Sequence, residues 1–123
     1  MKKSVAAVGV GLALLSGCML YARRAAQVKR DAVYQIPLAQ FQRGLRLGAS
    51  RSEVRKYLDS QNAQYSDTWD IAQKIGEDPG DSFVCDRWSV FIALKFNQLP
   101  GQTEPSPSDN LSSISIEKRG HCL

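Results

Sequence analysis

The hydrophobic residues in the C-terminal third of the chain recur with a period of two. Apolar side chains occupy every second position of one stretch: Trp88, Val90, Ile92, Leu94 and Phe96. This alternation is typical of a strand with one face on a core. Residues 111–118 repeat it with Ile114 and Ile116, after a proline-rich segment at 99–110 that predicts a long exposed loop. We expect the two strands to pair antiparallel.

A helical period precedes these strands. Ser50 and Glu53 have the spacing of a capping box, in which the serine oxygen accepts a hydrogen bond from the Glu53 amide. Val54, Tyr57 and Leu58 then fall on one face. The charged side chains are expected outside this face: Arg51, Arg55, Lys56 and Asp59. The pattern predicts a helix over 51–61 with Asn62 as its C-terminal cap.

Residues 64–76 allow two interpretations. Asp67 can cap a second short helix that packs Trp69, Ala72 and Ile75 inward and ends at Gly76. Alternatively, residues 64–69 form an edge strand. We favour the helix.

The N-terminus has the form of an export signal. Lys2 and Lys3 precede an uncharged apolar run over 5–15. As a helix this run is about 16 Å long, too short for the roughly 30 Å core of a bilayer. The alternative is an uncleaved anchor over 5–22, stopped by Arg23 and Arg24.

The run ends in Leu15-Ser16-Gly17-Cys18, which closely resembles the lipobox of bacterial lipoproteins. The resemblance implies a signal peptide at 1–17, diacylglycerol on the Cys18 thiol, and an acylated N-terminus such as a palmitate provides. Met19 stands where an aspartate retains lipoproteins in the inner membrane of Gram-negative bacteria. The expected location is therefore the outer membrane, or the cell membrane in an organism with a single membrane.

The net charge and the length of the mature chain indicate its class of partner and its number of domains. The full chain has 16 Lys and Arg against 12 Asp and Glu, so loss of Lys2 and Lys3 leaves 14 against 12, which does not indicate a nucleic-acid binder. Residues 18–44 are expected to be the lipidated N-terminus and a partly helical tether interrupted by Pro37. Four basic residues in it either meet anionic headgroups or are simply solvated: Arg23, Arg24, Lys29 and Arg30. Residues 45–123 are expected to form one small domain.

Cys85 and Cys122 remain after Cys18 is assigned to the lipid, and an even pair in an exported domain predicts a disulfide. An intermolecular bond or two free thiols are the alternatives. A regular ladder with Ile114 and Ile116 facing the core would put the two thiols on opposite faces. We therefore expect an irregularity at Gly120 or near Asp86.

The sequence shows no pattern typical of a catalytic, cofactor-binding or metal-binding site. His121 is the sole histidine, so any serine–histidine pair must use a residue at the chain end. Gly80 to Phe83 resemble the nucleophile block of GDSL hydrolases, but Lys118 occupies the position of the required aspartate, so Ser82 is interpreted as a loop residue. The acidic cluster at 77–81 lacks the spacing of a calcium loop. We expect no small-molecule substrate and no enzyme activity.

The order of elements resembles the SmpA/OmlA (BamE-like) outer-membrane lipoproteins. Their opening motif has its counterparts in Gly48, Ser50, Glu53 and Val54, followed by "FIALKFN" and "LSSISIEK". The resemblance covers Leu45 to Lys118, with a longer loop before the strands and no glycine-proline after the first helix. It implies a two-layer α+β domain in the periplasm, with one or two short helices packed on an antiparallel sheet of about three strands.

Two functions follow as hypotheses. The first is a non-enzymatic, protein-binding accessory or scaffold subunit, lipid-anchored at the outer membrane. The second is a periplasmic inhibitor or immunity protein, whose loop Leu99 to Asn110 enters the cleft of a hydrolase. Aromatic residues such as Phe91 or Trp69 either mark the binding surface or pack in the core, and core packing is the simpler explanation of each.

Overall fold

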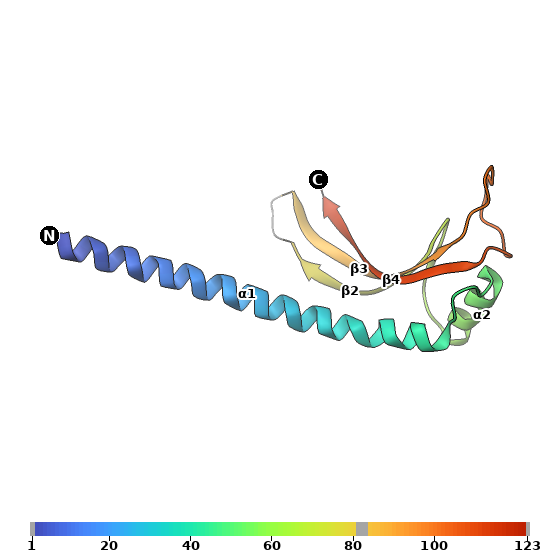
Figure 1. The fold of residues 1–123 in the computed structure, drawn as a ribbon, viewed down its shortest axis with the longest axis horizontal. Helices are drawn as coiled ribbons and strands as arrows, with labels where there is room; N and C mark the ends of the chain where they lie inside the picture. Colours follow the sequence, from blue (N-terminus) through green and yellow to red (C-terminus); the bar gives the residue numbers. More distant parts are fainter. Residues whose placement is uncertain (1, 81–83, 123) are drawn as a thin grey trace. The chain divides into compact units, whose positions relative to one another are not determined.

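The structure is a computed structural model that describes residues 2–80 and 84–122, with side chains from residue 13 onward. In chain order the elements are α1 (Lys2–Gly44), α2 (Arg51–Ser60), β1 (Ser66–Asp67), β2 (Ile71–Pro79), β3 (Cys85–Phe96) and β4 (Leu111–Cys122) (Figure 1). The chain divides into two compact units, residues 1–33 and 34–123, and α1 runs through their boundary. The fold is α+β, with two helices and an antiparallel sheet.

The first unit consists of the N-terminal part of α1. Two side-chain contacts stabilise its last turns: Gln27 Nε2 donates to Asp31 Oδ1 at 2.8 Å, and Arg30 donates to Gln27 Oε1 at 2.7 Å. Both pairs have the three- or four-residue spacing of neighbours on a helix surface.

The second unit begins inside α1, at Tyr34. Pro37 does not interrupt the helix, contrary to the expectation of a broken tether. An interior proline costs roughly 3 kcal/mol, and burial of Tyr34 and Phe41, each 8% exposed, offsets that cost at about 1.5–3 kcal/mol per large apolar side chain. Tertiary packing therefore holds this last part of α1 helical.

Helix α2 confirms the capping pattern at both ends. The Ser50 side chain accepts from the Glu53 N–H at 3.2 Å. At the C-terminus Asn62 adopts φ 53°, its N–H bonds to the Asp59 carbonyl, and the Ala63 N–H bonds to the Leu58 carbonyl, both at 3.1 Å. These two bonds are those of a Schellman motif. Arg51 was expected outside, but it is fully buried.

Within the described residues the sheet has four strands in the order β1-β2-β3-β4, one more than expected. The helix preferred for residues 67–76 is wrong, because β2 occupies this stretch, pairing Ile71 with Leu94 and Lys74 with Phe91. The alternative edge strand at 64–69 is present in part as β1. A register shift between Lys74 and Gly76 breaks the alternation of β2, which explains why the sequence pattern did not indicate a strand.

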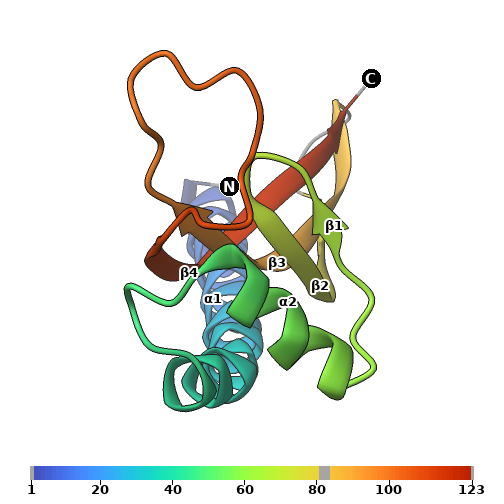
Figure 2. The same ribbon diagram turned by 90° about the vertical axis from the view of Figure 1, so that its right-hand side faces the viewer.

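Strands β3 and β4 pair antiparallel as predicted, with Ile92 opposite Ile116 and Leu94 opposite Ile114. The C-terminal part of α1 and all of α2 pack on this face of the sheet (Figures 1 and 2). The core consists of Phe41, Leu45, Ala49, Val54, Leu58, Ile71, Ile92, Leu94, Phe96 and Leu111. Among the described residues no helix lies on the opposite face of the sheet (Figure 1).

The expected irregularity in the β3–β4 ladder lies near Asp86. The register shifts between Cys85 and Arg87, so that Cys85 becomes the direct partner of Cys122. The ladder is regular at Gly120, which pairs with Trp88. One extra residue in β3 thus turns the Cys85 side chain to the face that Cys122 occupies.

Candidate functional site

The lipobox residues lie in the N-terminal part of α1. Cys18 is an exposed free thiol, and neighbouring apolar side chains are exposed as well: Leu14, Leu15, Met19 and Leu20. A Cβ added at Gly17 would meet nothing within 4 Å. Across the described part of the chain, no helix offers an apolar stretch long enough to cross a bilayer.

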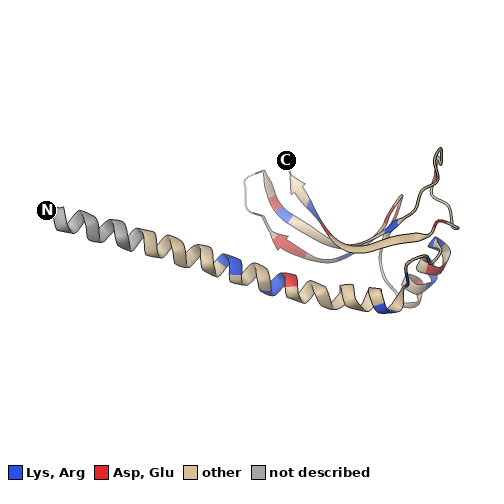
Figure 3. Ribbon diagram, viewed as in Figure 1, with Lys and Arg blue, Asp and Glu red and all other residues tan. Residues whose placement is uncertain are grey.

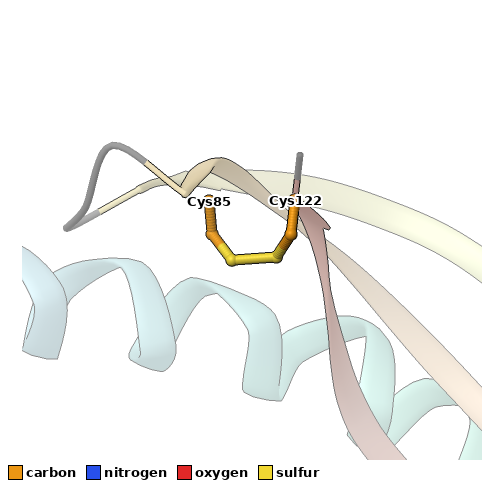
Figure 4. Close-up of a disulfide and its surroundings, with 2 residues drawn as sticks. All are labelled: Cys85 and Cys122. Atoms are coloured by element: carbon orange, nitrogen blue, oxygen red, sulfur yellow. A yellow bond between two sulfur atoms is a disulfide. The ribbon is translucent and has the colours of Figure 1, made fainter.

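The other two predicted site residues close the far end of the β3–β4 ladder. A disulfide joins Cys85 to Cys122, with the Cα atoms 4.1 Å apart (Figure 4). On the same face the Trp88 ring covers Gly120, where an added Cβ would lie 3.0 Å from that ring and from Cys122 Sγ. A side chain at residue 120 would therefore require the Trp88 ring or the disulfide to shift.

A serine–histidine pair is present near this end, which the sequence did not indicate. Ser89 Oγ and His121 Nε2 are 2.6 Å apart. Ser89 is 2% exposed in the middle of β3, so a substrate carbonyl cannot reach its oxygen. The hydrogen bond joins two neighbouring strands. Ser82 lies outside the described residues.

Metal ligands are not gathered in the described ranges, where no group of three or more His, Cys, Asp and Glu side chains could hold an ion. Carboxylates on the sheet form ion pairs instead. Glu77 accepts from Lys74, and this hydrogen bond is the largest cause that holds the pKa of Glu77 below its usual range. Glu117 lies 3.1 Å from Arg119 Nε and 3.9 Å from Lys95 Nζ.

The uncovered face of the sheet carries these charges together with one aromatic ring. The Arg119 guanidinium lies 4.9 Å from the centre of the Phe91 ring. Figure 3 marks both Lys or Arg positions and Asp or Glu positions along the strands. Phe91 is half-buried, whereas Trp69 at the β1–β2 turn is 37% exposed. Of the two aromatic residues considered as binding markers, Trp69 is the more accessible.

Arg51 is a fully buried charged side chain at the centre of a polar cluster, which the sequence did not indicate. Its Nη1 lies 2.9 Å from Asp67 Oδ1 and donates to the Thr68 carbonyl at 3.0 Å, while Nη2 donates to the Trp69 carbonyl at 2.7 Å. Nη2 also lies 3.7 Å from Asp109 Oδ2. One buried cation thus connects α2 to the β1–β2 turn and to the end of the 99–110 loop.

The 99–110 loop is held at its C-terminal end by Asp109. The backbone N–H of Ser106 donates to the carboxylate at 2.9 Å, and the Gln102 amide donates to both of its oxygens at 3.1 Å. The Ser106 bond is the largest cause that holds the pKa of Asp109 below its usual range; Gln102 and Arg51 act in the same direction, and desolvation opposes them. Leu99, at the start of the loop, is 75% exposed.

A hollow of about 450 Å³ opens where α1 turns into α2. Its lining includes Gly44, Leu45 and Ala49, with charged side chains of Arg43 and Glu53. The Tyr57 ring fills the space next to Gly44, where an added Cβ would lie 2.4 Å from the phenol oxygen. Leu47, in the connection between the helices, is exposed. The lining of the hollow therefore combines apolar and charged residues.

Comparison with known proteins places the chain in no family. No family model matches it, and it has no significant match among the curated proteins or the solved structures.

Proposed function

We propose that this chain is a lipid-anchored cell-envelope protein that binds other proteins and catalyses no reaction. In this proposal residues 1–17 are a signal peptide, acylated Cys18 inserts into the outer membrane, and the α+β unit faces the periplasm as an accessory or scaffold subunit. In an organism with a single membrane, Cys18 would anchor the protein in the cell membrane. The location of Cys18 carries the proposal: its exposed thiol follows Leu15-Ser16-Gly17, in a unit separate from the disulfide-bonded one.

A likeness to the BamE-like lipoproteins is consistent with this proposal, since that resemblance implies helices on one face of an antiparallel sheet. Three of the residues that carry the resemblance lie at the start of α2 or just before it. Gly48 adopts φ 91°, a backbone conformation that suits glycine. Ser50 caps α2, and Val54 is buried beneath it.

Protein binding is supported by the apolar side chains that the α+β unit leaves exposed. Leu47 lies in the connection that borders the hollow, and Leu99 and Trp69 are also exposed. Of these residues Leu47 carries the argument, because an apolar side chain exposed beside a hollow can anchor a partner.

The test is a pull-down in mild detergent from the organism's own membranes, with wild type and Cys18→Ala compared. Ser16→Ala is the matched control, because alanine is also small and leaves the lipid acceptor intact. We expect radiolabelled palmitate on wild type and Ser16→Ala but not on Cys18→Ala, and an envelope protein complex recovered only with the labelled forms. Absence of label from wild type would refute the anchor, and purified protein that turns over a substrate would refute the absence of catalysis.

An inhibitor or immunity function is the second candidate, favoured by the ordered 99–110 loop. The bonds at Asp109 fix one end of this loop while Leu99 stays exposed, and a loop fixed before binding loses less entropy in a cleft. This candidate predicts that a soluble hydrolase is retained by wild type and Cys18→Ala alike. It also predicts that Leu99→Ala weakens the inhibition of that hydrolase.

A further inference from the structure

The two edges of the sheet differ in how they are protected from pairing with another chain. On one side β1 is two residues long, β2 has a register shift between Lys74 and Gly76, and Pro79 ends the strand. Short edge strands, bulges and prolines are the devices that prevent edge-to-edge association.

Strand β4, at the other edge, has none of these devices over most of its length. Its register with β3 is continuous from Ser113 to His121, a stretch of about 30 Å. Beyond the bridge of Asn110 with Ser50 at its start, β3 is the only described segment paired with β4. Lys118 is exposed on the core face, with a 36% exposed side chain, but its Nζ lies 2.8 Å from buried Asp78, so its charge is paired within its own copy.

We propose that β4 is a self-association surface, on which β4 of a second copy pairs antiparallel across a two-fold axis at Lys118. The two sheets then form one continuous sheet of eight strands. The occupant is argued to be a second copy because the sequence of β4 is complementary to itself in this register.

Charge is complementary on the uncovered face. Antiparallel pairing about Lys118 places Glu117 opposite Arg119 of the second copy, and Arg119 opposite its Glu117. Both side chains are solvent-accessible, at 35% and 45%. Opposite charges directly across an antiparallel pair are stabilising, and like charges are destabilising. The two Lys118 residues at the axis each keep their own carboxylate, Asp78.

Shape is complementary on the core face. The same register places Ile116 opposite Gly120 of the second copy and Ile114 opposite its Cys122. Ile114 and Ile116 are only half-buried in one copy, where they pack at the margin of the core. Gly120 has no side chain and lies against the Trp88 ring, so a facing isoleucine would gain an apolar contact.

The test is sedimentation equilibrium of the full lipidated chain in a detergent matched to the density of the solvent. We expect a monomer–dimer equilibrium for wild type. Glu117→Arg and Arg119→Glu each place like charges at two symmetric positions, and we expect the dissociation constant to rise about tenfold in each. The double variant restores both pairs and should dimerise as wild type does. Arg87→Glu is the matched control, because Arg87 lies one strand further in on the same face and is paired with Glu77 rather than with Glu117 or Arg119; this change should leave the dimer unchanged.

Thermal unfolding of each variant establishes that the fold is kept.

Cross-linking is a second measurement, in which each copy carries only one changed residue. A copy with Glu117→Cys and a copy with Arg119→Cys should form a disulfide cross-link in native membranes. Two Ser113→Cys copies should not, because this register separates them by ten residues, about 33 Å. A monomeric wild type, equal dissociation constants in all charge variants, or Ser113→Cys cross-links would overturn the proposal.

Discussion

Replacing Arg51 by methionine should destabilise the second unit more than any other change to a charged side chain of α2. The side chain is 0% exposed and bonds to Asp67 and to the carbonyls of Thr68 and Trp69. Methionine keeps much of the apolar volume of the arginine side chain. The loss of stability in this variant therefore measures the contribution of the guanidinium group. Asp109, with 5% side-chain exposure, would then keep a buried charge without its cation. Removing one partner of a buried ion pair costs about 3–5 kcal/mol.

The guanidinium also lies 4.2 Å from the centre of the Phe96 ring, a contact worth about 0.5–2 kcal/mol. We keep the total at about 3–5 kcal/mol, because these contributions are not additive and one Arg51 atom, Nε, has no hydrogen-bond partner within the described residues. Domains of this size have a stability of about 5–15 kcal/mol. The change therefore removes a large part of the total.

Urea unfolding with the disulfide intact measures the loss, provided that fluorescence and circular dichroism give coincident transitions. Arg55→Met is the matched control. Arg55 Nε lies 2.6 Å from the same Asp67, but its side chain is 36% exposed, and such an ion pair is worth about 1 kcal/mol or less. Equal, small losses of stability in the two variants would refute the reasoning. They would show that the contacts of buried Arg51 contribute no more stability than those of exposed Arg55.

Three further changes test other parts of the structure. Replacing both cysteines of the disulfide by serine should lower the free energy of unfolding by about 4 kcal/mol in the chain-entropy account, for residues 37 apart, and an unchanged urea midpoint would contradict it. Gly76→Ala should cost about 1–3 kcal/mol in a thermal or urea melt, because the new Cβ would lie 2.8 Å from the Tyr34 ring, and an unchanged melt would contradict this. Asp109 has a lowered pKa in the folded state, so its ionisation contributes stability above the ordinary aspartate pKa of about 3.9, and this contribution is lost as the pH falls through the lower folded value. Asp109→Asn should therefore be less stable at pH 7 and lose less further stability in acid; an acid dependence equal to that of wild type would contradict this.

The parts of the fold that the sequence predicted are those determined by neighbouring residues. Ser50 and Glu53 are three positions apart, and the cap they form depends on nothing distant. The alternation in β3 and β4 is likewise read within each strand, and a proline-rich loop predicts their antiparallel pairing. Cys85 and Cys122 followed from their even number in a chain expected to be exported.

The parts that the sequence did not predict depend on pairing across the chain. Trp69, Ala72 and Ile75 fit a helical period, and only pairing with β3 decides for β2. The helix through Pro37 is similar, because the contacts that hold it are made by Tyr34 with Glu77 and Asp78 and by Phe41 in the core. A local pattern cannot contain these contacts.

Arg51 shows the same limit at the polar centre. A helical period places it outside because it is charged, and charged residues are rarely buried without a partner. Its partners Asp67 and Asp109 are 16 and 58 positions further along the chain, too distant for a periodicity to reveal. The capping serine is nevertheless a usable signal, since the residue after a cap is fixed at the first turn of the helix. In α2 that turn faces the end of the 99–110 loop, where the Arg51 N–H bonds to the Asp109 carbonyl at 2.8 Å. A buried arginine at such a position requires at least one carboxylate from the facing loop, because burial of its charge without one would cost more than the helix can supply.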